Sequence, residues 1–194
     1  MNSRALAYLH GLPLSSDSYP DAQAKASLVH EVLQLAEGRT LDPALPSVVH
    51  QLFAAPPPVS GWVPEVLYRT LMLGILDARG LSDADALRVM RAKYRQILSS
   101  PLYSVLFGLV GAPRFLKSID QRWRQFHRGT EMQATVSDRD VTIEFLAPTP
   151  MFEGLVGEIQ KVSMEVILGR VTGNQNGVLH VERRPRGYRY VGTW

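Results

Sequence analysis

The sequence contains no cysteine among its 194 residues. Disulfides, thiolate metal sites, cysteine nucleophiles and iron–sulfur clusters are therefore excluded, although a missing thiol does not identify the compartment. No charged-then-apolar leader opens the chain, and no apolar run approaches the roughly 18 residues that a membrane helix needs. We therefore expect a cytoplasmic protein without a membrane span.

Catalytic motifs and a strong charge bias are missing as well. The sequence has no G-x-S-x-G nucleophile elbow and neither of the glycine-rich phosphate-binding patterns. The formal net charge of +3 is too small to predict nucleic-acid binding by itself. We therefore predict a non-enzymatic protein.

The chain does have enough apolar residues to build a core. It is 45% hydrophobic and 20% charged, which is typical of a globular protein rather than a disordered one. Its length suits one domain, or one domain with a helical subdomain.

The last third of the chain predicts a hairpin, a helix and a second hairpin. Glu131–Ser137 and Asp140–Leu146 alternate apolar and polar residues, as half-buried strands do. A helical apolar stripe runs from about Met151 to Gly169. Val178–Arg183 and Tyr188–Thr193 are predicted to pair as the second hairpin. This ββαββ unit predicts one antiparallel sheet with a helix on one face.

The first 130 residues predict helices instead. Ser3–Leu12 is left open between helix and strand, and the remaining apolar stripes predict helices at Asp21–Ala36, Pro43–Phe53, Trp62–Arg79, 82–98 and 113–129. The predicted fold class is α+β, with an N-terminal layer of about five to six helices packed on the ββαββ sheet unit. The predicted division is a helical subdomain at residues 1–130 and a sheet subdomain at residues 131–194, together forming one compact domain.

The five histidines do not show the spacing of a metal site. No two lie four residues apart, where they would share one face of a helix: His10, His30, His50, His127 and His180. A single histidine can still be an axial haem ligand, and His127, beside Phe126 at the junction of helix and sheet, is the candidate for cofactor binding. The structural alternative is a histidine placed at a helix C-terminus, where positive charge is favoured.

The aromatic residues predict a pocket for a small apolar ligand or a protein partner, between the sheet, the central helix and the helices of residues 62–126. Its candidate lining residues are Trp62, Tyr68, Tyr94, Tyr103, Phe107, Phe115, Trp123, Phe145 and Phe152. The alternative is that these aromatics are plain core.

Two surfaces provide other hypotheses. The last hairpin carries four arginines among tyrosines, which could bind nucleic acid or another anion, or could simply solvate a sheet edge: Arg183, Arg184, Arg186 and Arg189. The apolar segment Pro101–Val110 could form the interface of a homodimer or a scaffold.

The order of landmarks resembles a myxobacterial paralogous family of unknown function. These landmarks are Trp62-Val-Pro64, Pro101-Leu-Tyr103, Trp123-Arg-Gln-Phe126, Gly187-Tyr-Arg-Tyr190 and Trp194. That family is similar in layout to haem–NO-binding and 4-vinyl-reductase-like domains, which implies helices first, then a small sheet crossed by a helix, and a sensory or regulatory role. The haem-binding relatives use a histidine ligand and a Tyr-x-Ser-x-Arg clamp. This chain has no such clamp, and it lacks the cysteines that members often carry, so the resemblance does not carry over a haem site.

Overall fold

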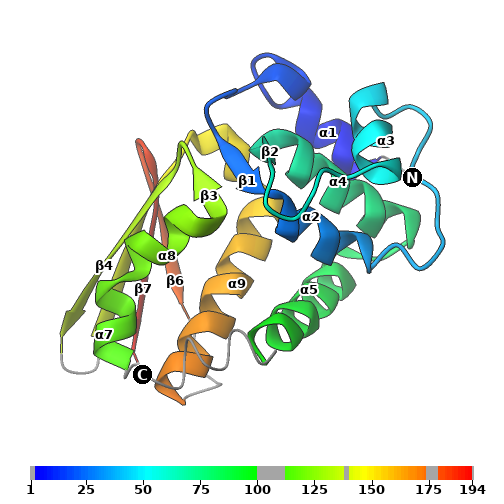
Figure 1. The fold of residues 1–194 in the computed structure, drawn as a ribbon. Helices are drawn as coiled ribbons and strands as arrows, with labels where there is room; N and C mark the ends of the chain where they lie inside the picture. Colours follow the sequence, from blue (N-terminus) through cyan, green and yellow to red (C-terminus); the bar gives the residue numbers. More distant parts are fainter. Residues whose placement is uncertain (1–2, 100–111, 138–139, 174–178, 194) are drawn as a thin grey trace. The chain divides into compact units, whose positions relative to one another are not determined.

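The computed structural model describes residues 3–99, 112–137, 140–173 and 179–193 (Figure 1). They form a mixed α+β fold, with most helices in the first part of the chain and an antiparallel four-stranded sheet towards its end. The predicted fold class is confirmed. The chain divides into two compact units: unit 1 comprises Met1–Ser82 and Gln125–Gly129, and unit 2 comprises Asp83–Arg124 and Thr130–Trp194.

Unit 1 is built around one buried helix. Its helices are α1 (Arg4–His10), α2 (Ala26–Leu33), α3 (Ser47–Ala54) and α4 (Glu65–Ala78), with a 3-10 turn η1 at Ser15–Asp17. Every residue of α4 from Glu65 to Leu76 is buried, and α1, α2 and α3 all pack against it. A helix that is apolar on nearly every side can take this central position, because it has no face that must stay in water.

Unit 1 also contains a three-stranded antiparallel sheet that the sequence did not predict. Its order is β2-β1-β3, and the strands are β1 (Gln23–Lys25), β2 (Trp62–Pro64) and β3 (His127–Arg128). The predicted helix starts at Asp21 and Trp62 were therefore wrong. Val63 precedes Pro64, and the residue before a proline avoids the helical region.

The four-stranded sheet of unit 2 has the order β4-β5-β7-β6. Strands β4 (Glu131–Ser137) and β5 (Asp140–Leu146) have the predicted bounds, and β6 (His180–Arg184) and β7 (Gly187–Thr193) lie within two residues of theirs. All three ladders are antiparallel, as predicted.

The central helix α9 spans Leu155–Thr172, so the predicted start at Met151 was wrong. Thr149–Phe152 forms the 3-10 turn η2 instead, and Gly154 follows it with φ of 60°. Tyr188 on β7 donates its hydroxyl to the carbonyls of Thr149 and Phe152, at 3.2 and 2.9 Å. These two contacts hold the 3-10 turn against the sheet, and helix α9 begins only after the turn, at Leu155.

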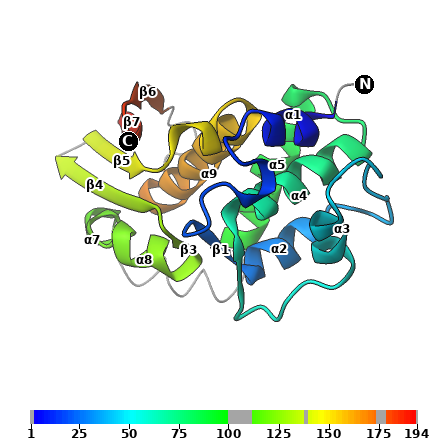
Figure 2. The ribbon, with the colours of Figure 1, turned by 90° about the horizontal axis from the view of Figure 1, so that it is seen from above.

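The other helices of unit 2 are α5 (Asp83–Leu98), α7 (Ala112–Lys117) and α8 (Ile119–Phe126). The helix predicted from Pro113 onward is thus two helices separated at Ser118. Figure 2 shows α5 beside α9, and Arg91 and Glu165 join them by an ion pair of 2.5 Å. Among the described residues, every helix is too short or too polar to cross a bilayer.

Candidate functional site

Helix α4 buries a carboxylate and a guanidinium in the middle of unit 1. Glu65 is 0% exposed and Arg69, one turn further along the helix, is 2% exposed. Nε and Nη2 of Arg69 lie 2.8 and 2.7 Å from Oε1 of Glu65. Glutamate followed by arginine at this spacing is the favourable order on a helix, and Glu65 in the first turn also suits the helix dipole.

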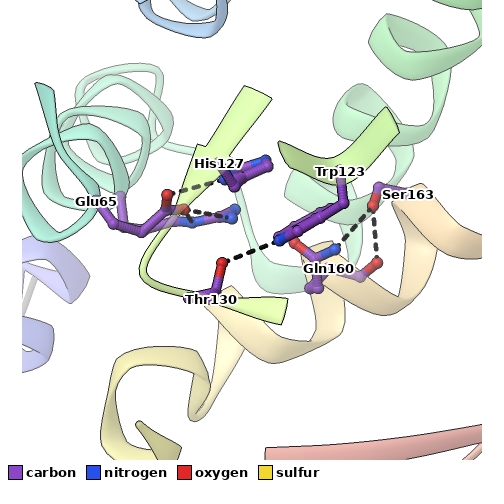
Figure 3. A network of polar contacts seen from close by, with 7 residues as sticks. Glu65, Trp123, His127, Thr130, Gln160 and Ser163 are labelled. Atoms are coloured by element: carbon purple, nitrogen blue, oxygen red, sulfur yellow. Dashed lines mark hydrogen bonds and ion pairs between the residues drawn. The ribbon is translucent and has the colours of Figure 1, made fainter. Parts of the chain in front are cut away.

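His127 completes this buried cluster from a distant part of the sequence. It lies on β3, where it is paired with Ala24 of β1, and its exposed fraction is 6%. Its Nδ1 lies 2.9 Å from Oε2 of Glu65 (Figure 3). An ionised carboxylate only accepts hydrogen bonds, so Nδ1 carries the hydrogen and donates it.

The two partners decide the charge state of Glu65. Burial alone would raise the pKa of this carboxyl, but the charges and hydrogen bonds of His127 and Arg69 outweigh burial and lower its pKa from 4.5 to about 2. The Tyr8 phenol on α1 belongs to the same environment, because burial raises its pKa, Arg69 opposes that rise and Glu65 adds to it. Glu65 is therefore ionised, and Tyr8 is protonated, at neutral pH.

Sequence reasoning selected His127 but missed Glu65 and Arg69. A signal was present: they are charges of opposite sign, four residues apart, in a stretch that is otherwise apolar from Val66 to Leu76. A helix without a solvent-exposed face buries such charges, so each of them needs an oppositely charged or hydrogen-bonding partner in the interior. The partner on β3 could not be found this way, because His127 is 62 residues from Glu65.

The predicted aromatic lining falls into both units. In unit 1, Trp62 is half-buried on β2 and Tyr68 is buried on α4. In unit 2, Tyr94 packs against the core of Leu98, Val162 and Val166. Tyr103 and Phe107 lie outside the described residues, as does the predicted interface Pro101–Val110. The ligand pocket and that interface stay predictions.

Three of the predicted aromatics form one contact chain within unit 2. The ring centroids of Trp123 and Phe145 are 5.2 Å apart, and those of Phe145 and Phe152 are 4.7 Å apart, both edge to face. Nε1 of Trp123 donates to Oγ1 of Thr130 at 3.0 Å (Figure 3). Phe115 is also buried in this unit, with the Arg122 guanidinium 4.6 Å from its ring centroid.

Glutamates face three of the four arginines of the last hairpin. Arg183 pairs with Glu153, while Arg184 and Arg189 lie 2.5 and 3.6 Å from Glu182. Arg186 is exposed at the turn. These carboxylates reduce the positive potential that an anion would meet, and the nucleic-acid hypothesis stays a prediction.

Comparison with known proteins adds little. No protein-family model and no curated protein matches the chain. One similar solved structure is described as a Cs H-NOX mutant with the unnatural amino acid 4-cyano-L-phenylalanine at site 5. It shares 15% sequence identity over 87% of this chain and 94% of that one, with a TM-score of 0.47. A likeness of this extent decides neither the fold nor the function of this chain, and the myxobacterial family stays a prediction.

Proposed function

We propose that the chain is a non-enzymatic regulatory domain that binds a small ligand, and that the buried cluster of Glu65, Arg69 and His127 is the part that responds. The observation that carries the proposal is a buried polar cluster anchored on helix α4, in which every residue from Glu65 to Leu76 is buried. Buried ion pairs are often no more stabilising than apolar residues of similar volume. Strongly perturbed carboxyls with specific partners gather at functional sites.

The position of His127 along the chain supports a regulatory role. Residues 125–129 belong to unit 1, whereas the residues on both sides of them belong to unit 2. A ligand that strengthens or breaks the bond between His127 and Glu65 therefore acts on the segment that is covalently continuous with α8 and β4.

Native mass spectrometry of the purified full chain tests the proposal. We expect a retained small molecule on the wild-type protein and its loss from His127→Ala. His180→Ala is the matched control, because His180 is exposed on β6, and it should keep the molecule. A wild-type protein that carries no molecule, or equal retention by both variants, would contradict the proposal.

Haem is a second candidate ligand, favoured by the geometry of one residue. Ligating histidines usually donate their other ring N–H to a carboxylate, as Nδ1 of His127 does to Glu65. The chemistry of His127 thus fits an axial ligand, while the sequence lacks the carboxylate clamp. A visible absorption scan tests this candidate. A Soret band at about 400 nm that His127→Ala abolishes supports haem, and a colourless wild-type protein after growth with added haem rejects it.

A further inference from the structure

The outer face of the three-stranded sheet in unit 1 gathers two cations around one indole. Residues that face each other across an antiparallel ladder share a side of the sheet. The register puts Ala24, Val63 and His127 on one side, and all three are buried. The opposite side carries Gln23, Lys25, Trp62, Pro64 and Arg128, of which Arg128 is exposed and the others are half-buried.

Lys25 and Arg128 both form cation–π contacts with the ring of Trp62. Nζ of Lys25 lies 4.5 Å from the centroid of the ring, and Cζ of Arg128 lies 3.9 Å from it. Within the described residues, neither cation forms an ion pair with a carboxylate. This sets them apart from Arg183, Arg184 and Arg189, which glutamates face.

The two positive charges are close enough to act on one ligand. Both lie within 4.5 Å of one centroid, so they are less than about 9 Å apart, which is comparable with the Debye length at physiological salt. Their mutual repulsion is offset only in part by the indole, because an exposed cation–π contact is weak. A doubly charged anion that contacts both Lys25 and Arg128 would relieve their mutual repulsion.

The backbone holds the pair in place before any ligand arrives. Gly129 follows Arg128 with φ of +67°, and a Cβ there would lie 2.3 Å from the carbonyl oxygen of Asp21. This close approach fixes β3 against the residues that lead into β1. Arg128 and Lys25 are therefore presented from two strands that are already paired, so a ligand does not have to bring these strands together.

We propose that Lys25, Arg128 and Trp62 form a binding site for a small phosphate monoester. Its phosphate carries close to two negative charges at neutral pH, which matches the two cations. The guanidinium suits paired phosphate oxygens, and the ammonium of lysine binds phosphate as a point charge. This site goes beyond the proposed function, because it uses the side of the sheet opposite His127.

Isothermal titration calorimetry of the full chain with phenyl phosphate tests the site. Phenyl sulfate is the matched control ligand, because it has a similar shape and one negative charge fewer. We expect phenyl phosphate to bind more tightly than phenyl sulfate. Lys25→Gln and Arg128→Gln should each weaken it roughly tenfold or more, since each removes a hydrogen-bonding charge. Lys25→Arg should retain binding. Arg170→Gln, an exposed residue of α9, should leave it unchanged.

Amide chemical shifts locate the binding. They should move at residues 23–25, 62–63 and 127–129, and thermal unfolding should show that the two glutamine variants remain folded. Equal affinity for the two probes, no binding of phenyl phosphate, or an equal loss in Arg170→Gln would overturn the proposal. None of these outcomes bears on the ligand retained through His127, which native mass spectrometry measures separately.

Discussion

At the scale of single residues, Gly129 is a position that tolerates no side chain. Its φ of +67° disfavours other residues, and an added Cβ would collide with backbone atoms of Asp21 and Ala22. Gly80 is a matched control because it has the same φ of +67° but nothing within 4 Å of the added atom.

We expect Gly129→Ala to lower the free energy of unfolding by more than the roughly 1–2 kcal/mol that the left-handed backbone alone costs, and Gly80→Ala to lower it by only that amount. Urea unfolding of both variants measures the difference. Equal losses would mean that β3 moves aside at little cost.

Glu65 is the counter-charge of the buried Arg69 guanidinium, so removing the charge of Glu65 should be costly. We expect Glu65→Gln to destabilise the protein by about 3–5 kcal/mol at neutral pH, since the Arg69 guanidinium would remain buried without its counter-charge. Glu153→Gln removes a carboxylate from an exposed pair with Arg183 and should cost less than about 1 kcal/mol. Similar losses in the two variants would contradict the burial argument.

At the scale of elements, helix α9 offers a test of packing, because the same substitution of isoleucine by alanine can be made at a buried and at a partly buried position. Ile159 is 0% exposed, whereas Ile167 is only partly buried beside the core of Leu98, Val162 and Val166. We expect Ile159→Ala to cost about 2–5 kcal/mol and Ile167→Ala clearly less, because the cavity left at Ile159 cannot fill with water. Thermal unfolding measures both. The reverse order would place Ile159 outside the core of unit 2.

Elements with a local pattern could be predicted from the sequence. The hairpin of β4 and β5 follows from seven-residue stretches of clean alternation, and its bounds are confirmed. The small sheet of unit 1 could not be predicted, because strands of two or three residues show no period. Each exists through partners far along the chain, as in the pairing of Ala24 with His127.

The candidate site was predictable only in part for the same reason. His127 stood out as an isolated histidine at a junction, and Glu65 and Arg69 were visible as charges within an apolar stretch. Their meeting depends on β3 lying beside β1, which no local pattern encodes. The sides of the sheet, and hence the pairing of Lys25 with Arg128 around Trp62, follow from that register alone.

At the scale of the whole molecule, acid should unfold unit 1 through Glu65. The pKa of this carboxyl is lowered from 4.5 to about 2 in the folded protein. A lowered pKa contributes stability that is fully present above pH 4.5 and is lost as the pH falls towards about 2. We expect the stability difference between wild type and Glu65→Gln to be constant above pH 5 and to shrink below pH 4.5.

Hydrogen exchange at several pH values locates this loss. Amides of α4 and α1 should lose protection as the pH falls from 4.5 to 3 in the wild-type protein, and Glu65→Gln should show a flatter profile. If the stability difference between wild type and Glu65→Gln instead grows as the pH falls, the pKa of Glu65 is not lowered by folding.

The discontinuity of unit 1 has a consequence for biosynthesis. When Ser82 has been translated, Glu65 and Arg69 are already made, but β3 and His127 follow only after residues 83–124. The nascent unit therefore holds a carboxylate without its histidine and a strand β1 with one open edge, which is the kind of exposed edge that invites wrong pairing. Unit 1 begins before unit 2 along the chain, but it cannot finish folding until residues 125–129 have been made.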